Sequence, residues 1–424
     1  MIPRVRVILS HAGVQYSYPL ARALYELGVL ERFFTTFLFS PKHPVARFLA
    51  ILPERLREPL SGYLHRRIAD GLAEAPVEAC AWPEFWRRTG TVLFGRSARM
   101  ANRLIAWQNR AFDVRVARCL RHASYDILIA LSGSALESIR VAKRMGKIAI
   151  VDQHDIHYRT AERLLAEEQE RSPAWSATTG YWPPLRNYLE RLEEEMQLAD
   201  YILVPSGFSL RTHLEAGIPS SKLIRVCHGV EAPFESLPRE RRPDGTFRIL
   251  FAGQITQRKG VPYLLEAVKA LGQSDVELVL LGDRVRGVPN LDPYKRFVRH
   301  VGYVPHGKLK FFFDQADVLV LPSIYDAFGM VALEAMAAGL PVIVSENTAA
   351  GSDVVRDGID GFVVPIRDVE ILKDRLLRLK NDPDLARRMG EHGRIRVQAF
   401  GWKAYKDAVA GAMERVWSGA AVCA

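Results

Sequence analysis

Cysteine is scarce in this chain of 424 residues. Its four cysteines, Cys80, Cys119, Cys227 and Cys423, stand far apart and lack the spacing of a metal site. The sequence therefore argues against a disulfide framework or a zinc site, and it predicts a reducing, cytoplasmic environment. Long apolar runs are also missing, since none approaches the ~20 residues of a transmembrane helix. The apolar run within residues 1–10 is too short for a signal peptide and is expected to form a first buried strand.

Acidic residues are scarce at the start of the chain. Residues 1–150 contain 23 Lys and Arg against 11 Asp and Glu, a surplus of +12, which leaves −2 for the remainder of a chain that carries +10. The first ~150 residues are rich in arginine and aromatic residues, in segments that include residues 32–39, 48–52 and 85–88. Such segments fit peripheral contact with an anionic membrane, and they fit equally well helices with an apolar core stripe and a basic face. Nucleic acid is a third option, but no binding motif accompanies the charge, so none is expected.

Strand and helix patterns alternate through most of the remaining chain. A proline-rich and charged segment near residues 231–245 interrupts the alternation and is expected to be a linker. We therefore predict an α/β protein with two doubly wound parallel sheets, in domains at residues 1–235 and 246–395. An aromatic, proline-containing segment at residues 175–184 is expected to be a lid or a wall of the acceptor site.

Residues 323–341 form the most informative stretch of the chain. They follow one predicted strand and precede another, with a helix expected to begin at Phe328. Asp326 stands just before this helix and Glu334 lies within it. Anions are favoured at a helix N-terminus, which offers the backbone amides of Phe328, Gly329 and Met330. The stretch can hold a sugar phosphate with its hydroxyls, although an ordinary strand–loop–helix crossover explains the spacing equally well.

A second loop, residues 253–260, comes directly after a predicted strand and before a helix. Gly253 lets the backbone approach a ligand closely, and Arg258 and Lys259 stand where amides, helix dipole and side-chain charge all favour a phosphate. The loop is neither a Walker loop nor a dinucleotide fingerprint, and no Asp-x-Asp metal motif lies beside it. Taken alone, it is also explained by a plain turn.

Two further loops lie in the first half. Residues 152–157, Asp-Gln-His-Asp-Ile-His, end a predicted strand, and open α/β sheets place their chemistry at this edge. Histidines here can serve catalysis or the core. The first predicted strand runs into a loop containing Gly13, which by itself indicates no more than a turn.

Taken together, these stretches resemble the retaining glycosyltransferases of family 4, which have the GT-B fold. The resemblance covers most of residues 200–400 in the correct order. It rests on residues 253–260, 282–283, 301–304, 322–342, 351–353 and 357–361. Across residues 1–150 it thins to the first strand–helix turn and the general architecture.

The resemblance implies a nucleoside-diphosphate sugar donor that is bound mostly by the second domain. Lys259 matches the lysine that binds the donor diphosphate, and Arg258 is expected to supply a second charge because Gln254 occupies the usual basic position. Glu334 matches the carboxylate that accepts hydrogen bonds from the ribose. Asp326 stands where the family usually has a glutamate near the transferred sugar.

The remaining implied contacts complete a cleft. The amides after Phe328 and Gly329 are expected to touch sugar or phosphate, and the backbone around Tyr303 and Val304 the base. Across the cleft, a first-domain histidine is expected to hydrogen-bond the donor sugar or to organise the acceptor. His154 is preferred for this role over His157, with Gly13 and Asp155 on the same acceptor side.

The implied reaction is front-face attack with retention, in which Lys259, Arg258 and helix amides stabilise the leaving diphosphate. The acceptor is expected to be a glycan or a lipid-linked molecule, and no cofactor or metal is expected. A helix near residues 396–424 is expected to pack back on the first domain. Two alternatives stay open: a non-catalytic nucleotide-sugar-binding protein with this fold, and double-displacement glycoside hydrolysis by the two carboxylates, which leaves the phosphate loop unexplained.

Overall fold

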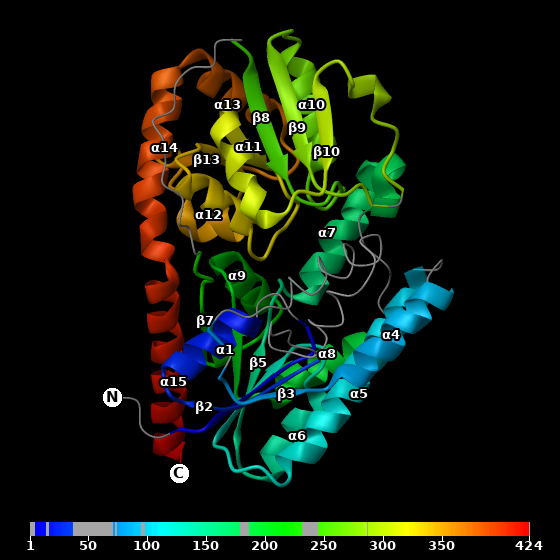
Figure 1. The fold of residues 1–424 in the computed structure, drawn as a ribbon, viewed down its shortest axis with the longest axis vertical. Coiled ribbons are helices and arrows are strands. Elements are labelled where there is room, and N and C mark those ends of the chain that lie inside the picture. The colour runs from blue at the N-terminus through cyan, green and yellow to red at the C-terminus, as the bar shows by residue number, and fades with distance from the viewer. Residues whose placement is uncertain are drawn as a thin grey trace, which may run out of the picture.

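The first domain is built on a seven-stranded parallel sheet with the strand order β3-β2-β1-β4-β5-β6-β7 (Figure 1). The computed structural model describes residues 5–13, 17–36, 71–72, 74–94, 98–178, 186–230, 245–285 and 287–423. The strands are β1 (Val7–His11), β2 (Leu30–Thr35), β3 (Val77–Ala79), β4 (Ile127–Leu131), β5 (Ile148–Asp152), β6 (Tyr201–Val204) and β7 (Leu223–Arg225). The helices are α1 (Ser17–Glu26), α4 (Ala81–Phe94), α5 (Ala98–Leu120), α6 (Leu136–Arg144), α7 (Tyr158–Arg171), α8 (Arg186–Leu198) and α9 (Gly207–Glu215).

The second domain has a six-stranded parallel sheet with the order β10-β9-β8-β11-β12-β13. Its strands are β8 (Phe247–Ala252), β9 (Val276–Leu281), β10 (Val298–Gly302), β11 (Val318–Leu321), β12 (Val342–Ser345) and β13 (Gly361–Val364). Its helices are α10 (Val261–Leu271), α11 (Leu309–Gln315), α12 (Met330–Ala337), α13 (Val369–Asn381) and α14 (Pro383–Val397), and α15 (Trp402–Cys423) follows. All paired strands of both sheets are parallel, so the predicted α/β class is confirmed. Residues 37–39, 48–52 and 231–244 and the aromatic residues Tyr181 and Trp182 lie outside the described residues.

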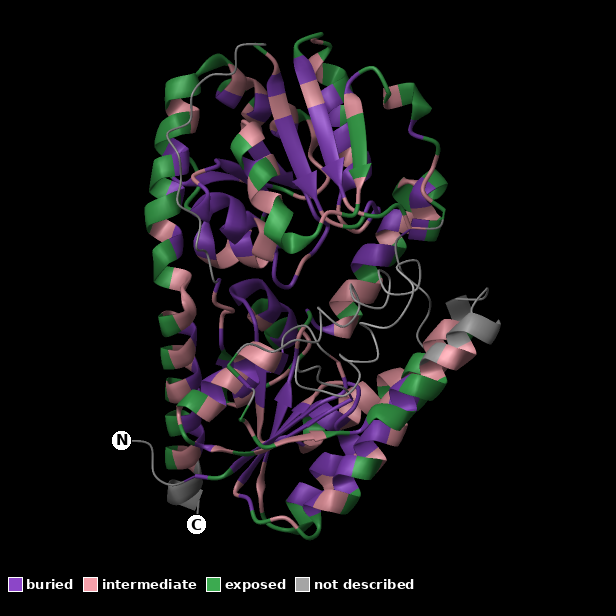
Figure 2. Ribbon diagram, viewed as in Figure 1, coloured by how far each residue is buried: buried purple, intermediate pink, exposed green. Residues whose placement is uncertain are grey.

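Near-continuous apolar sequences explain why the inner strands of both sheets are buried on their two faces (Figure 2). Strand β4 reads Ile-Leu-Ile-Ala-Leu and is buried along most of its length. Helix α15 runs alongside the first domain and supplies Tyr405, Val409 and Met413 to the same core cluster as Leu20 of α1 (Figure 1). The C-terminal helix therefore crosses from the second domain to the first.

Two details differ from the sequence pattern. Helix α12 begins at Met330 rather than Phe328, because Gly329 takes up a left-handed conformation (φ +61°) at the N-cap. Trp175, which lies in the first half of the chain, packs into the core of the second domain. The segment that carries Trp175 therefore bridges the two domains.

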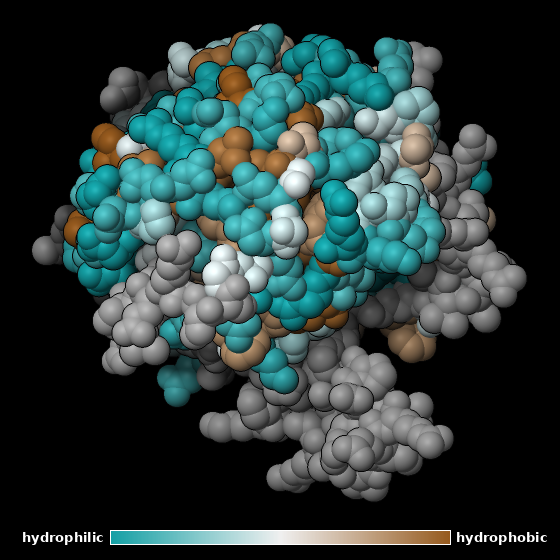
Figure 3. All heavy atoms as spheres, turned by 90° about the horizontal axis from the view of Figure 1, so that it is seen from above, coloured by the Kyte–Doolittle hydropathy of each residue, from teal (hydrophilic) through white to brown (hydrophobic). Residues whose placement is uncertain are grey.

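The surface at the far end of the second domain is mostly hydrophilic, with small scattered hydrophobic patches (Figure 3). Among the helices of the described residues, none has both the length and the apolar character needed to cross a membrane.

Candidate active site

Glycines shape the loop after β8 because neighbouring backbone leaves no room for a side chain. Gly260 is left-handed (φ +71°), and a Cβ there would lie 1.9 Å from the carbonyl oxygen of Pro322. A Cβ on Gly282 would lie equally close to the carbonyl oxygen of Gly253. Only glycine fits at positions 260 and 282. The loop therefore folds tightly against the carboxyl ends of β9 and β11, and the ligand-approach role of Gly253 stays a prediction.

This folding brings together three of the charged residues singled out from the sequence. The Lys259 ammonium forms an ion pair and a hydrogen bond with the carboxylate of Asp326, and both side chains are largely buried. Burial alone raises the pKa of Asp326, but the charges of Lys259 and Arg258 hold that pKa below its ordinary value. The Arg258 guanidinium lies 5.3 Å from the ring centroid of Tyr325. It also faces Asp155 of the first domain, whose pKa burial raises against the opposing charge of Arg258.

The N-terminus of α12 offers fewer amides than the sequence indicated. The Phe328 amide donates to the Asp326 carboxylate at 3.4 Å. In the part of the chain that the structure describes, the amides of Gly329 and Met330 donate no hydrogen bond. Two of the three predicted amides therefore remain as donors for an anion.

Glu334 lies on α12 with 8% of its surface exposed, and burial raises its pKa. Its partner is His306, whose Nδ1 lies 3.7 Å from Oε1 of Glu334. His306 was not predicted from the sequence, although it closely follows the predicted base-binding pair after β10. Of that pair, the Tyr303 side chain is 55% exposed and Val304 packs on the second-domain core.

Across the cleft, four residues form a histidine–aspartate cluster at the carboxyl ends of first-domain strands. Nε2 of His154 lies 2.9 Å from Nε2 of His11 and 3.1 Å from Oδ2 of Asp152. The ring of His228 stacks at 6.2 Å from that of His154. Burial lowers the pKa of His11 to about 3 and that of His228 to about 3, so both imidazoles are neutral. Burial raises the pKa of Asp152, but the three histidines outweigh it and the pKa lies below the ordinary value.

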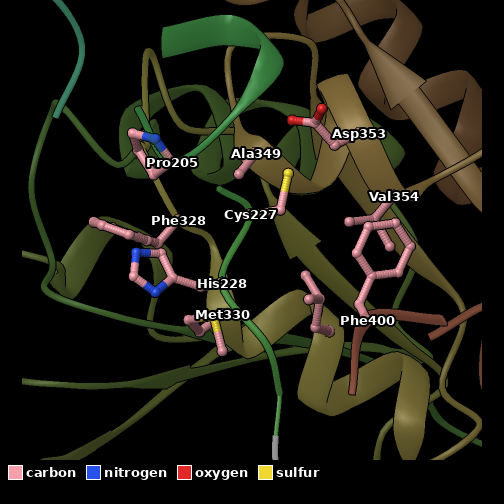
Figure 4. Close-up of a pocket in the computed structure, with 10 residues that line it drawn as sticks. Pro205, Cys227, His228, Phe328, Met330, Ala349, Asp353, Val354 and Phe400 are labelled. Carbon is pink, nitrogen blue, oxygen red and sulfur yellow. The ribbon is translucent and has the colours of Figure 1, made fainter. Parts of the chain in front are cut away.

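Phe328 connects the two sides of the cleft. Its ring centroid lies 4.4 Å from that of His228, and Figure 4 shows the two rings as neighbours. The ring centroid of His154 lies 6.1 Å from that of Phe328. The ring of His228 also lies near that of Tyr405 of α15, at 5.6 Å. The predicted donor loop and the preferred first-domain histidine are therefore neighbours. His11, Asp152 and His228 were not predicted as site residues. The local signal for each was a histidine or aspartate at or just after the end of a strand.

The other predicted acceptor-side residues have different positions. Gly13 accepts or donates hydrogen bonds at Nδ1 of His11, with its oxygen at 3.1 Å and its nitrogen at 3.0 Å, so it orients that ring. His157 is buried at the N-cap of α7, where its Nδ1 accepts from the Arg159 amide at 3.3 Å. The ring of His157 packs against His213. These contacts give His157 a capping role and place it outside the histidine–aspartate cluster.

Two buried carboxylates join the domains on either side of the site. Glu168 of α7 contacts Arg367 Nε at 2.6 Å and the Tyr263 hydroxyl at 2.9 Å. Asp353 of the second domain accepts from the Gly207 amide at 2.7 Å and from Arg225 at 2.5 Å. Charged hydrogen bonds of this kind link the two domains on both sides of the site.

Two facing parallel-sheet domains with a cationic loop on one side of the cleft and histidines on the other define the GT-B fold. Residues 234–396 match the model of the family described as Glycosyl transferases group 1, and this part of the chain belongs to that family. The resemblance noted in the sequence is thereby confirmed at the level of the family group.

Similar proteins agree with this assignment. The chain is 31% identical over 206 residues to an uncharacterised 41.2 kDa protein in the cps region of Klebsiella pneumoniae, covering 46% of this chain and 56% of the relative. It is 34% identical over 178 residues to a D-inositol 3-phosphate glycosyltransferase of Streptomyces griseus, covering 38% and 37%. The matches thus span about half or less of these relatives. In fold, it resembles a sucrose-phosphate synthase from Thermosynechococcus elongatus, with a TM-score of 0.65, 21% identity, and coverage of 98% of this chain and 100% of the other.

The buried histidines predict a loss of stability at mildly acidic pH. The pKa values of His11 and His228 are lowered to about 3 and that of His157 to about 4, while the unfolded value is 6.5. Between pH 6.5 and 4 the unfolded chain therefore binds up to three more protons, so the free energy of unfolding falls as pH falls, by roughly 1.4 kcal/mol per pH unit for each histidine. Urea denaturation at several pH values measures this slope.

A matched pair of variants isolates one contribution. His157→Gln is expected to reduce the pH dependence of the free energy of unfolding by about the contribution of one proton, because glutamine does not titrate. His122→Gln, at an exposed position, is expected to leave the slope unchanged. Equal slopes for the two variants would contradict the assignment of His157 as a buried neutral group.

Proposed function

We propose that this chain is a retaining glycosyltransferase of the hexosyltransferase type. It moves a sugar from a nucleoside-diphosphate sugar to a hydroxyl of a glycan or lipid-linked acceptor, in the synthesis of cell-surface polysaccharide or glycolipid. The observation that carries the proposal is the Lys259–Asp326 pair, with Arg258 beside it, facing His154 across the cleft through Phe328. The names of the relatives, one from a cps region and one an inositol-phosphate glycosyltransferase, support the class.

In the proposed function, the donor diphosphate replaces the Asp326 carboxylate as the partner of Lys259. The charge of Lys259 is balanced by Asp326. A diphosphate near Lys259 and Arg258 competes for the same charge, and the amides of Gly329 and Met330 add two donors. As the sugar–phosphate bond breaks, negative charge grows on the leaving diphosphate, and these groups stabilise that charge.

His154 acts on the sugar side as a hydrogen-bond acceptor. Because Asp152 is ionised, it favours the tautomer of His154 with the proton on Nε2, which lies 3.1 Å from its oxygen. Nδ1 then carries the lone pair and accepts from a sugar hydroxyl. His11 holds the same edge of the ring, so Asp152 and His11 are positioning residues for His154.

Peripheral contact with an anionic membrane is part of the proposal for the first domain. The side chains of Phe85 and Trp86 on α4 are 62% and 57% exposed. Aromatic rings of this kind enter a membrane interface, and the arginine surplus of residues 1–150 favours anionic head groups.

Loss of the donor-side charges is expected to abolish turnover. Lys259→Ala and Glu334→Gln should each reduce sugar transfer or donor hydrolysis by at least ~100-fold, because groups of this kind stabilise transition-state charge and orient the donor. Release of nucleoside diphosphate measures the effect, with UDP-, GDP- and ADP-sugars first ranked by thermal shift. Lys269→Ala, on the exposed face of α10, is the control and should retain activity. Full activity in Lys259→Ala would overturn the site, and donor binding without any turnover in the wild type would favour a non-catalytic binding protein.

We further propose that transfer needs no metal ion, because Lys259 and Arg258 already supply cationic charge to the diphosphate. EDTA is expected to leave the rate unchanged. The ligand atoms of His11, Asp152 and His154 lie within 4.8 Å of one another and can hold a metal, which makes the test a sharp one. Loss of activity with EDTA and its recovery with Zn²⁺ or Mg²⁺ would refute metal independence.

A further inference from the structure

A large cavity lies beside the edge strand of the first domain, away from the donor loop. Its volume is about 830 Å³, and it lies between the end of β3 and the outer face of α5. Its walls include Trp82, Trp107, Arg110 and Arg118, with Cys80 at its base. Cavities of this size hold small molecules or their head groups.

The cavity carries uncompensated positive charge. Arg110 and Arg118 are exposed on one face of α5 and form no ion pair or hydrogen bond with any described residue. Arg115 also lines the cavity, 3.9 Å from Glu78, but Glu78 is shared with Arg32 at 3.2 Å. One carboxylate thus faces two guanidinium groups. A guanidinium without a partner carboxylate binds phosphate oxygens in a bidentate manner.

Aromatic side chains from α4 and α5 also line the cavity. The rings of Trp82 and Trp107 meet edge to face at 5.8 Å and are 51% and 42% exposed. Two exposed indoles in the same cavity as Arg110 and Arg118 favour a ligand with an anionic end and an apolar end.

The register of the sheet places this cavity close to the histidine–aspartate cluster. Ala79 at the end of β3 pairs with Thr35 of β2, and Thr35 pairs with His11 of β1. Adjacent strands are ~4.8 Å apart, so the backbone of Ala79 lies about 10 Å from that of His11 along the same edge of the sheet. A molecule anchored at the cavity can therefore reach the cluster with one or two sugar units.

We propose that this cavity binds the phosphate or diphosphate ester of an acceptor that also carries an apolar group. The hydroxyl to be glycosylated then lies at the histidine–aspartate cluster, where the His11 backbone is about 10 Å from that of Ala79 at the cavity wall. The assignment rests on the proposed glycosyltransferase function and adds the chemical class of its acceptor. A phosphate in the head group of a membrane lipid has the same chemistry, and the experiment separates the two sources.

The test compares Arg110→Gln/Arg118→Gln with Arg103→Gln, an exposed arginine of α5 outside the cavity walls. Dodecyl phosphate, kept below its micelle concentration, is titrated against each protein while tryptophan fluorescence is followed. The wild type and the Arg103 variant are expected to bind equally, and the double variant at least about tenfold more weakly, because two charge-assisted contacts are lost. Dodecyl glucoside, which is neutral, is expected to bind weakly to all three.

A second arm uses vesicles of phosphatidylcholine with and without phosphatidylglycerol. Loss of dodecyl phosphate binding in the double variant, with unchanged vesicle binding, supports a site for a single acceptor molecule. Loss of both supports a lipid head group as the source of the phosphate. Equal affinity of all three proteins for dodecyl phosphate, or tighter binding of a short single-stranded DNA, would overturn the inference.

The thermal shift with nucleotide sugars is measured on the same proteins. It is expected to be unchanged in the double variant, since the cavity lies outside the donor loop. A missing donor response in the wild type would count against the proposed function, whereas a normal donor response without phosphate binding would count against the cavity alone.

Discussion

The electrostatics of the cleft depend on the Lys259–Asp326 ion pair. Two opposite charges are held largely out of water, where each alone is costly and the pair is stable only because it is well matched. Removing either side chain would leave the other charge buried without a partner. An incoming anion that satisfies Lys259 can therefore displace Asp326 only if that carboxylate gains new partners, such as sugar hydroxyls. Donor binding and the repositioning of Asp326 are thus one event in the proposed function.

The same need for matched charge governs how the domains meet. The buried carboxylates of Glu168 and Asp353 each accept hydrogen bonds from groups of the opposite domain, so the contact between the domains satisfies both charges. Arg367, which reaches Glu168, has a left-handed backbone (φ +70°), and few non-glycine residues adopt this conformation without compensating contacts. A few hydrogen-bonded ions therefore link the domains at the flanks of the site, while Phe328 and the histidines lie between them.

Much of this architecture can be predicted from local sequence patterns. The apolar strands, the loop glycines and the helix around Glu334 all follow from residue order, because their causes lie within a few residues. The sequence predicts the start of α12 two residues too early, because the left-handed backbone of Gly329 is set by the loop and not by local helix propensity. The grouping of His11, Asp152 and His228 could not be predicted, because the three residues come from separate strand ends that only the sheet order brings together. His157 caps α7 and packs against His213, whereas His154 lies in the cluster, and the functional role predicted for His154 stays a prediction.

The short arm of Asp326 is consistent with the charge distribution around it. A glutamate at this position, which the family resemblance leads one to expect, would extend one methylene further from the backbone. Aspartate keeps its carboxylate near the Phe328 amide and beside Lys259, within the field of Arg258. In the proposed function, Arg258 supplies the charge that the family pattern places at position 254, where this chain has the uncharged Gln254. The two departures from the family pattern therefore lie in one electrostatic unit: the cationic charge lies at residues 258–259, and the carboxylate that balances it is drawn back to meet it.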